Sequence, residues 1–334
     1  MKNIIPIISL SVIFSCTTQK TTDTAFDYAQ LEHVADSVKV GNIVILNSFK
    51  HQMLAHKNNQ YDPARIINKV YKPHQKLWDS CYAVIFGDEN AHLFNTPKGM
   101  AEWNNSFYQK NRPMFEEKTK ILLGINLKKT FEKSLVRFNK LVPFQPKARI
   151  SLVFTPITGI AFGGCSNEQF ALELNNKGID IPVTLKVDLP HELNHMVYEQ
   201  FRNADPDHAS ALNQTIDEGF ACYFTYVFFE GKLQKHEAIH LTQKEWDWFI
   251  SNEKQLFTQL KTYFADTSGK NPLLLNEKIK LFPEAPKNIN YWMGFRIIEK
   301  YVEKNGPDSW KDVYRLTAKD LLQKSGYEQY IESL

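Results

Sequence analysis

The chain has 334 residues, of which 43% are hydrophobic and 23% are charged, so it can bury a sizeable core as one large domain or two modest ones. Its formal net charge is only +3, and no basic stretch is interleaved with aromatic residues. We therefore expect no nucleic acid among its partners.

The N-terminus predicts a lipoprotein signal peptide over residues 1–15. Lys2 supplies a short positive region, and Ile4–Phe14 is a mostly apolar run that is too short to span a bilayer. The run ends in the sequence IFSC, which resembles a bacterial lipobox whose last residue, Cys16, becomes lipidated. We expect Cys16 to carry the lipid. An ordinary secretory signal with an incidental Cys16 is the alternative.

Residues 16–25 are polar and turn-prone, as expected of a tether that leads away from a membrane. No later segment has the ~18 uncharged apolar residues that a membrane-spanning helix needs. The sequence therefore predicts a protein of the cell envelope that is held to a bacterial membrane by its N-terminal lipid. The outer membrane is the expected one, on its periplasmic or surface face.

Three cysteines remain once Cys16 is assigned to the anchor. The spacings of Cys81, Cys165 and Cys222 match no thiolate metal motif. We interpret them as small buried residues that form at most one disulfide.

Residues 26–145 are predicted to be a mainly helical N-terminal region, and residues 146–334 to be a second domain in which a small sheet precedes further helices. The expected helices are Met100–Leu123, Leu127–Leu141, Leu189–Phe201, Ala209–Phe229, Glu245–Phe264 and Ile289–Lys304. The expected strands are Ala148–Phe154 and Phe170–Leu174, with loops at Ala91–Gly99 and Gly159–Gly164. The predicted fold class is therefore α+β, mostly helical.

The sequence HELNH at residues 191–195 is an HExxH motif. His191 and His195 are four residues apart, so both imidazoles can reach one metal ion from the same helix face. Glu192 is close enough to take a proton from metal-bound water. Pro190 in the first turn and an apolar stripe on the opposite face predict a helix here.

A second copy of the motif, HEAIH at residues 236–240, requires a choice between the two. Zinc peptidases need three protein ligands and an open position for water. Glu218 lies 23 residues after His195, a spacing that allows a turn and a second helix to return it to the metal. Glu245 and Glu253 follow the second copy, but neither lies at the start of an apolar helix as Glu218 does. We therefore place the metal at His191, His195 and Glu218.

The surroundings of Glu218 support this choice. Its segment is apolar nearly all round, which predicts a buried helix. An ionised carboxylate in such a helix is costly unless it binds a cation or pairs with a base. Zn²⁺ is the expected cation, and a buried salt bridge to an Arg or Lys is the alternative.

Four segments together resemble a known family. HELNH at 191–195, DEGFA at 217–221, YWMGF at 291–295 and LLQKSGY at 321–327 resemble, in this order, the predicted zinc-dependent proteases of the domain-of-unknown-function 2268 family. The resemblance covers about residues 149–327, and the N-terminal helical part matches less clearly. It implies a zinc metallopeptidase domain with a thermolysin-like (gluzincin) core, in which the small sheet lies beside the HExxH helix. It also implies that His191, His195 and Glu218 are the ligands of Zn²⁺.

Two departures from the gluzincin pattern concern the supporting residues. Cys222 occupies the position, one turn after the glutamate ligand, where a carboxylate often orients a zinc histidine. Asp217 or a carboxylate of the N-terminal half is the candidate replacement. Tyr291 is the candidate donor to the oxyanion of the transition state, with a place in the aromatic core as the alternative.

The resulting hypothesis is a zinc-dependent peptidase that acts on a peptide or protein substrate. The metal would lower the pKa of its water, Glu192 would be the general base, and Tyr291 would stabilise the oxyanion. Two alternatives stay open at this point. One is a non-catalytic envelope lipoprotein, a binding or assembly factor that retains the peptidase fold. The other is a metal-dependent hydrolase of a non-peptide amide.

Overall fold

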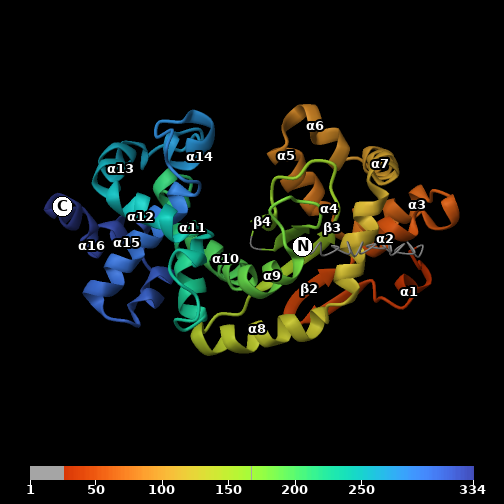
Figure 1. Cartoon of the computed structure of the whole chain (residues 1–334), viewed down its shortest axis with the longest axis horizontal. Helices are drawn as coiled ribbons and strands as arrows, with labels where there is room; N and C mark the ends of the chain where they lie inside the picture. The colour runs from red at the N-terminus through yellow and green to blue at the C-terminus, as the bar shows by residue number, and fades with distance from the viewer. Residues whose placement is uncertain (1–25, 167) are drawn as a thin grey trace, which may run out of the picture.

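The computed structural model describes residues 26–166 and 168–334 (Figure 1). The predicted signal peptide, the lipidated Cys16 and the tether at residues 16–25 lie outside the described residues. Within them the protein is α+β and mostly helical, with a small mixed sheet of five strands. This architecture confirms the predicted fold class at that level.

The strands of the sheet lie in the order β1-β2-β3-β5-β4. Their bounds are β1 (Ser37–Val40), β2 (Asn42–Leu46), β3 (Lys147–Val153), β4 (Phe162–Ser166) and β5 (Gln169–Glu173). β3 is central and runs parallel to both β2 and β5, whereas β1 and β4 are antiparallel edge strands. The last four residues of β3 are buried, as expected of a strand covered on both faces.

The N-terminal region is less helical than predicted, because residues 37–46 form the hairpin β1–β2 and complete the sheet. Gly41 lies at the turn with a φ of +57°, a conformation that favours glycine. Ile43 and Ile45 are fully buried on either side of a half-buried Val44, which is the two-residue period of a strand. Single short strands of this kind are hard to distinguish from helix by periodicity alone.

The loop predicted at Ala91–Gly99 is also wrong. Helix α6 (Gly87–Phe94) occupies its first part, and α7 (Pro97–Leu123) begins in its second. The hydroxyl of Thr96 accepts a hydrogen bond from the backbone N–H of Gly99, so this residue caps α7 and separates the two helices.

The predicted positions of the longer helices are mostly confirmed. The remaining helices of the N-terminal half are α1 (Ala29–Glu32), α2 (Ser48–Leu54), α3 (Pro63–Ile66), α4 (Gln75–Leu77), α5 (Ala83–Ile85) and α8 (Leu127–Leu141). Those that follow the sheet are α9 (Ile181–Val183), α10 (Leu189–Arg202), α11 (Ala211–Phe228), α12 (Gln243–Ser251), α13 (Glu253–Leu260), α14 (Pro272–Ile279), α15 (Ile289–Asn305), α16 (Ala318–Ser325) and α17 (Tyr327–Ser333). The helix predicted over Glu245–Phe264 is divided into α12 and α13 at Asn252.

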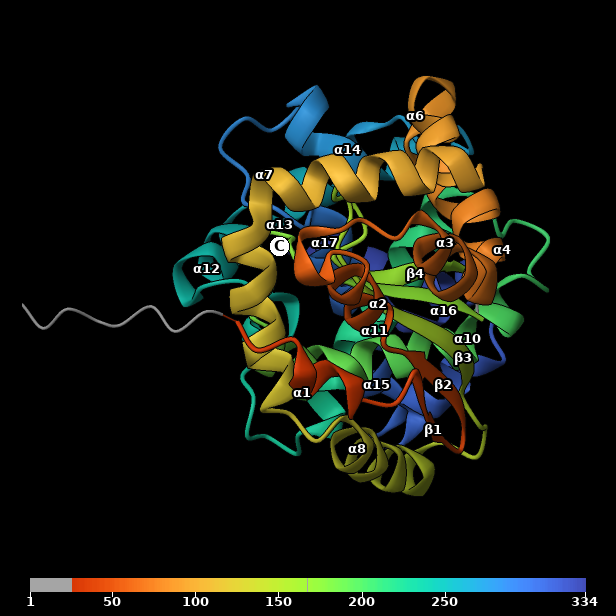
Figure 2. The same cartoon turned by 90° about the vertical axis from the view of Figure 1, so that its right-hand side faces the viewer.

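The sheet lies between two groups of helices. Helices α2 and α4 contact it on the side that faces the viewer in Figure 2, and α10 contacts β3 and β4 from behind. Helix α11 packs on α10 and also on α15. Gly219 and Gly294 lie where α11 and α15 cross, since a Cβ on Gly219 would lie 2.2 Å from the carbonyl carbon of Gly294.

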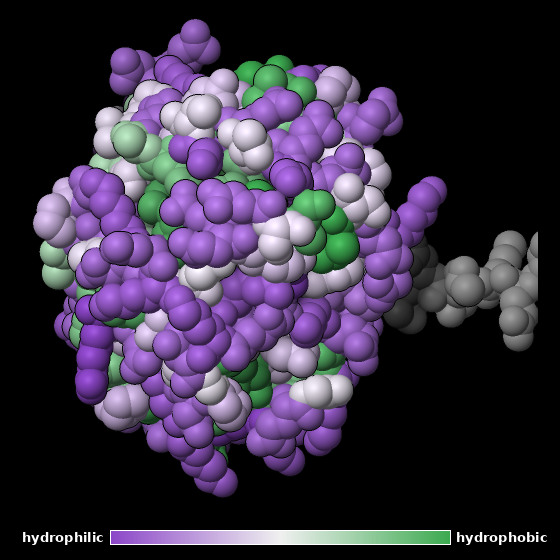
Figure 3. All heavy atoms as spheres, turned by 90° about the vertical axis from the view of Figure 1, so that its left-hand side faces the viewer, coloured by the Kyte–Doolittle hydropathy of each residue, from purple (hydrophilic) through white to green (hydrophobic). Residues whose placement is uncertain are grey.

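The outer face of the C-terminal helices is mainly hydrophilic, with hydrophobic residues only in small separate groups (Figure 3). Among the described helices, none has the length and apolar character needed to cross a bilayer.

One disulfide, Cys81–Cys165, joins the N-terminal helical region to strand β4. Cys222 is a free, buried cysteine. A disulfide of this kind is typical of proteins in oxidising compartments such as the bacterial envelope.

Candidate metal centre

Helix α10 carries the two histidines of the motif. Pro190 lies in its first turn, where a missing N–H costs no hydrogen bond. Leu193 and Val197 are fully buried against the core. The four-residue spacing of His191 and His195 therefore places both imidazoles together on the other, half-buried face.

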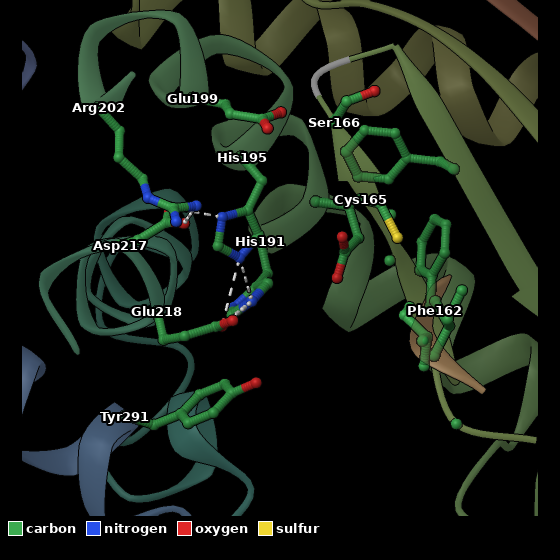
Figure 4. A pocket seen from close by; sticks show the side chains of 17 residues that line it. Phe162, Cys165, Ser166, His191, His195, Glu199, Arg202, Asp217, Glu218 and Tyr291 are labelled. Carbon is green, nitrogen blue, oxygen red and sulfur yellow. Dashed lines mark hydrogen bonds and ion pairs between the residues drawn. The ribbon is translucent and has the colours of Figure 1, made fainter. Parts of the chain in front are cut away.

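Helix α11 brings Glu218 to the two imidazoles (Figure 4). The Nε2 atoms of His191 and His195 are 2.9 Å apart. Glu218 Oε2 lies 3.4 Å from each of these nitrogens. One possible ligand atom of each residue thus lies within 4.8 Å of the other two. The structure brings together the three residues that the sequence places in two separate segments.

This donor set fits a zinc ion. Tetrahedral coordination at about 2 Å separates the donor atoms by roughly 3–4 Å. Glu218 Oε2 is buried and makes no hydrogen bond, so its capacity as an acceptor is unused by the protein. In the described part of the chain, Glu218 forms ion pairs only with the two histidines, and no Arg or Lys pairs with it. Two imidazole nitrogens and a carboxylate oxygen are ligands that Zn²⁺ favours.

The other ring nitrogens of the histidines face supporting side chains. His195 Nδ1 lies 2.8 Å from Asp217 Oδ1, and Arg202 donates to the second oxygen of Asp217 at 2.8 Å. Cys222 Sγ lies 3.8 Å from His191 Nδ1. Because both Nδ1 atoms are engaged, the Nε2 atoms are the ones that face the common point.

Sequence reasoning named Asp217 as a candidate support but missed Arg202. Arg202 lies two turns after His195 on the same side of α10, and this spacing is the signal that could have identified it. The contact of Cys222 with His191 was also missed. The sequence shows only that no carboxylate occupies this position, and the thiol contact depends on how α11 is rotated.

Glu192 lies beside the three ligand residues and is almost fully buried, with 6% of its surface exposed. Its carboxylate faces strand β4, because a Cβ on Gly163 would lie 3.7 Å from Glu192 Oε2. Burial raises the pKa of Glu192 to about 8.

Tyr291 lies in the first turn of α15 and points toward the ligand residues (Figure 4). Its ring centroid is 6.2 Å from that of His191, and the two ring planes differ by 14°. Burial raises the pKa of Tyr291 well above its usual range, so the phenol keeps its proton. Its role as a transition-state donor stays a prediction.

The second HExxH copy does not form one helix face. Residues Glu237–Ile239 form a short 3-10 turn, and His240 adopts the left-handed conformation with a φ of +57°. His240 pairs instead with Asp188, at 3.3 Å. Within the described residues, the only converging set of three possible metal ligands is the one on α10 and α11.

The candidate metal centre opens into a cleft of about 300 Å³. All of β4, Phe162–Ser166, lines one wall. Side chains of a strand alternate between two faces, so five consecutive lining residues mean that the edge of β4 borders the cleft. A second cavity of about 500 Å³ adjoins the first and extends to α14; the two share Arg202, Asp217, Glu218 and Tyr291.

A buried carboxylate holds the segment that precedes β4. Glu173 is fully buried and accepts hydrogen bonds from the backbone N–H groups of Gly159, Ile160 and Ala161 at 3.0, 3.2 and 2.9 Å. The hydroxyl of Tyr82 donates to its other oxygen at 3.1 Å. With the disulfide at Cys165, these bonds fix the position of this wall of the cleft.

Residues 187–329 match the model of a family described as gliding motility protein GldB, whose label marks a lipoprotein family. The match covers less than half of the chain, but it includes every residue of the candidate metal centre. No curated protein and no solved structure matches the chain. A match to a lipoprotein family indicates membrane association at the cell envelope, in agreement with the expectation from the N-terminus.

This match corrects the family resemblance and the function drawn from it. The matching family is one of gliding motility lipoproteins, and not the domain-of-unknown-function 2268 family of zinc proteases. The predicted peptidase function is therefore wrong, and the match favours the alternative of a non-catalytic envelope lipoprotein. The physical reason is that HExxH with a third carboxylate specifies how a metal is held. It does not specify what happens to a molecule that reaches the metal.

Proposed function

We propose that this protein is an envelope lipoprotein of gliding motility that binds a protein partner without hydrolysing it. The observation that carries the proposal is the match of residues 187–329 to gliding motility protein GldB, because this span contains α10, α11 and α15. The lipobox-like sequence at Cys16 supports a position on a membrane surface. We propose the outer membrane as that membrane.

The proposal includes Zn²⁺ held by His191, His195 and Glu218. When bound, the ion would link α10 to α11 and offer one coordination position to a group of the partner. Side chains of the protein itself orient the ligands. Asp217 orients His195, and Arg202 holds Asp217 in place.

The proposed partner contact is an extended polypeptide segment that lies along β4. The edge of β4 borders the cleft, so its backbone groups are available to a further strand. Gly163 and Gly164 present no side chain that would obstruct such a segment. Glu173 and the disulfide hold this wall before a partner arrives, which reduces the ordering cost of binding.

The predicted thermolysin-like core is part of the same proposal. We propose that the C-terminal part keeps a thermolysin-like (gluzincin) core in which the metal centre serves binding. Three features support it: the HExxH helix α10, the third ligand on the following helix α11, and a sheet beside α10. An experimental structure of the zinc-loaded protein would test this comparison of folds directly.

Complementation of gliding tests the proposed function. A strain that lacks the gene is expected to lose gliding, and the wild-type chain to restore it. Glu192→Gln is also expected to restore gliding, because it keeps the size of the side chain and removes only its ability to act as a base. His191→Ala is expected to lose both zinc, measured by metal analysis of the purified protein, and gliding.

Two outcomes would contradict the proposal. A Glu192→Gln protein that holds zinc and folds normally but fails to restore gliding would show that the site needs a general base. Normal gliding of the strain without the gene would remove the protein from gliding altogether.

A further inference from the structure

Helix α8 carries a basic stripe that the candidate metal centre does not use. Leu127, Phe131, Ser134, Leu135 and Phe138 form its buried face. Lys129, Lys133, Val136 and Lys140 follow one another at spacings of four, three and four residues, so they share the face directly opposite. We call these four residues the α8 stripe.

The α8 stripe is free of internal partners in the described part of the chain. None of its three lysines forms an ion pair there, whereas Lys128 pairs with Glu132 and Arg137 pairs with Glu230 beside the stripe. Val136 lies among the lysines with 60% of its surface exposed. An apolar residue surrounded by long basic side chains is the pattern of a helix that lies on a lipid surface.

The position of α8 suits such a contact. It lies at the lower edge of the molecule in Figures 1 and 2. Helix α14, which lines the second cavity, lies toward the upper edge in both views, and α5, which contributes Ile85 to the cleft, lies toward the upper edge in Figure 1. A molecule that rests on α8 therefore keeps its cleft away from the surface below it.

The anchored end of the chain leads into elements that contact α8. α8 contacts β1, which begins shortly after α1 near the start of the described residues. The ten residues from Cys16 to Phe26 span at most about 33–36 Å when extended. This length is the most that can separate the lipid from Phe26.

We propose that the α8 stripe docks on the anionic lipid headgroups of the membrane that holds the anchor. The lysines attract the headgroups and Val136 enters the interface between them. The inference rests on the lipid anchor of the proposed function. It adds an orientation in which the metal centre faces away from the membrane and toward a partner.

Vesicle binding of the full mature chain carrying Cys16→Ser tests the α8 stripe without the lipid. We expect the chain to sediment with vesicles that contain phosphatidylglycerol, and not with vesicles of phosphatidylcholine alone, with binding that weakens as salt is added. Each lysine near an anionic surface strengthens binding roughly fivefold. Replacement of Lys129, Lys133 and Lys140 by Gln is therefore expected to weaken binding about a hundredfold.

A matched variant replaces Lys98, Lys110 and Lys120 of α7 by Gln and changes the net charge equally. It is expected to bind the vesicles almost as well as the parent chain. Equal binding by the two triple variants, or no preference of the parent chain for phosphatidylglycerol, would overturn the inference. Fractionation of cells that express the unaltered chain tests the anchor separately, because a soluble protein there would refute the anchor and leave the vesicle result standing.

Discussion

At the scale of single residues, metal binding at the candidate centre would depend on which nitrogen of each imidazole is left free. An imidazole binds a metal through one nitrogen while the other donates a hydrogen bond, so the supporting partner selects the tautomer. Asp217 performs this role for His195 at 2.8 Å, and the more distant thiol of Cys222 faces His191. His195 is oriented more strongly than His191, because the carboxylate of Asp217, which Arg202 holds in place, is a better hydrogen-bond acceptor than the thiol of Cys222.

Replacement of Asp217 by Asn tests this support. The amide keeps the size of the side chain but loses the charge that holds the Nδ1 proton of His195 and the guanidinium of Arg202. We expect zinc affinity, measured by competition with a chelator, to fall about 10–100-fold. Asp308→Asn, at an exposed surface pair, is the control and is expected to leave affinity unchanged. Unaltered affinity in Asp217→Asn would show that the contact does not serve the metal.

The candidate ligands could be predicted because their signals are local. The HExxH spacing depends only on the pitch of one helix, and Glu218 is marked by the apolar segment around it. Arg202 and Cys222 carry no comparable signal, because their contacts depend on the rotation of α10 against α11. The candidate ligands could not distinguish a peptidase from a binding protein, since both kinds of protein can hold a metal with the same three residues.

At the scale of elements, α11 is fixed in place by its crossing with α15. Gly219 and Gly294 let the two backbones approach more closely than any side chain would permit. Glu218 directly precedes Gly219, so this crossing also fixes how far the third candidate ligand extends toward α10. Close packing of the two helices therefore sets the geometry of the candidate metal centre.

Gly219→Ala is expected to destabilise the protein, although alanine favours an isolated helix by about 1 kcal/mol. The added methyl would lie 2.2–2.4 Å from backbone atoms of Gly294 and Phe295, so the helices must separate. Overpacking of this kind costs typically 1–3 kcal/mol, measurable as a lower midpoint of urea unfolding. Gly124→Ala, whose Cβ would have no contact closer than 3.4 Å, is the control. A stabilised Gly219→Ala would show that the crossing is looser than described.

The elements differ in how well the sequence predicts them. α8 is found at its predicted bounds, Leu127–Leu141, because its apolar residues recur at helical spacing along its whole length. The hairpin β1–β2 was missed because each strand is short and its pairing with β3 bridges about a hundred residues of sequence. The periodicity of a single sequence does not show which distant strands pair.

At the scale of the whole molecule, the Cys81–Cys165 disulfide connects the two parts that the sequence assigns to separate domains. It fastens β4, and with it one wall of the cleft, to the helices that precede the sheet. The same core of buried side chains also runs through both parts, from Phe26 to Ile331. The candidate metal centre therefore depends on the N-terminal region, although its three candidate ligands all lie beyond residue 190.

Removal of this disulfide, by Cys81→Ser with Cys165→Ser, is expected to lower the midpoint of urea unfolding. The bridge spans 84 residues, and constraint of an unfolded loop of that length corresponds to roughly 4–5 kcal/mol at most. The unaltered protein treated with a reducing agent is expected to match the double variant, because Cys222 forms no bridge. β4 is also expected to lose protection from hydrogen exchange, since it is an edge strand paired only with β5 and loses its covalent link to the preceding helices. If neither the midpoint nor the exchange of β4 changes, Glu173 and the sheet alone hold this wall of the cleft, and the metal centre does not depend on an oxidising compartment.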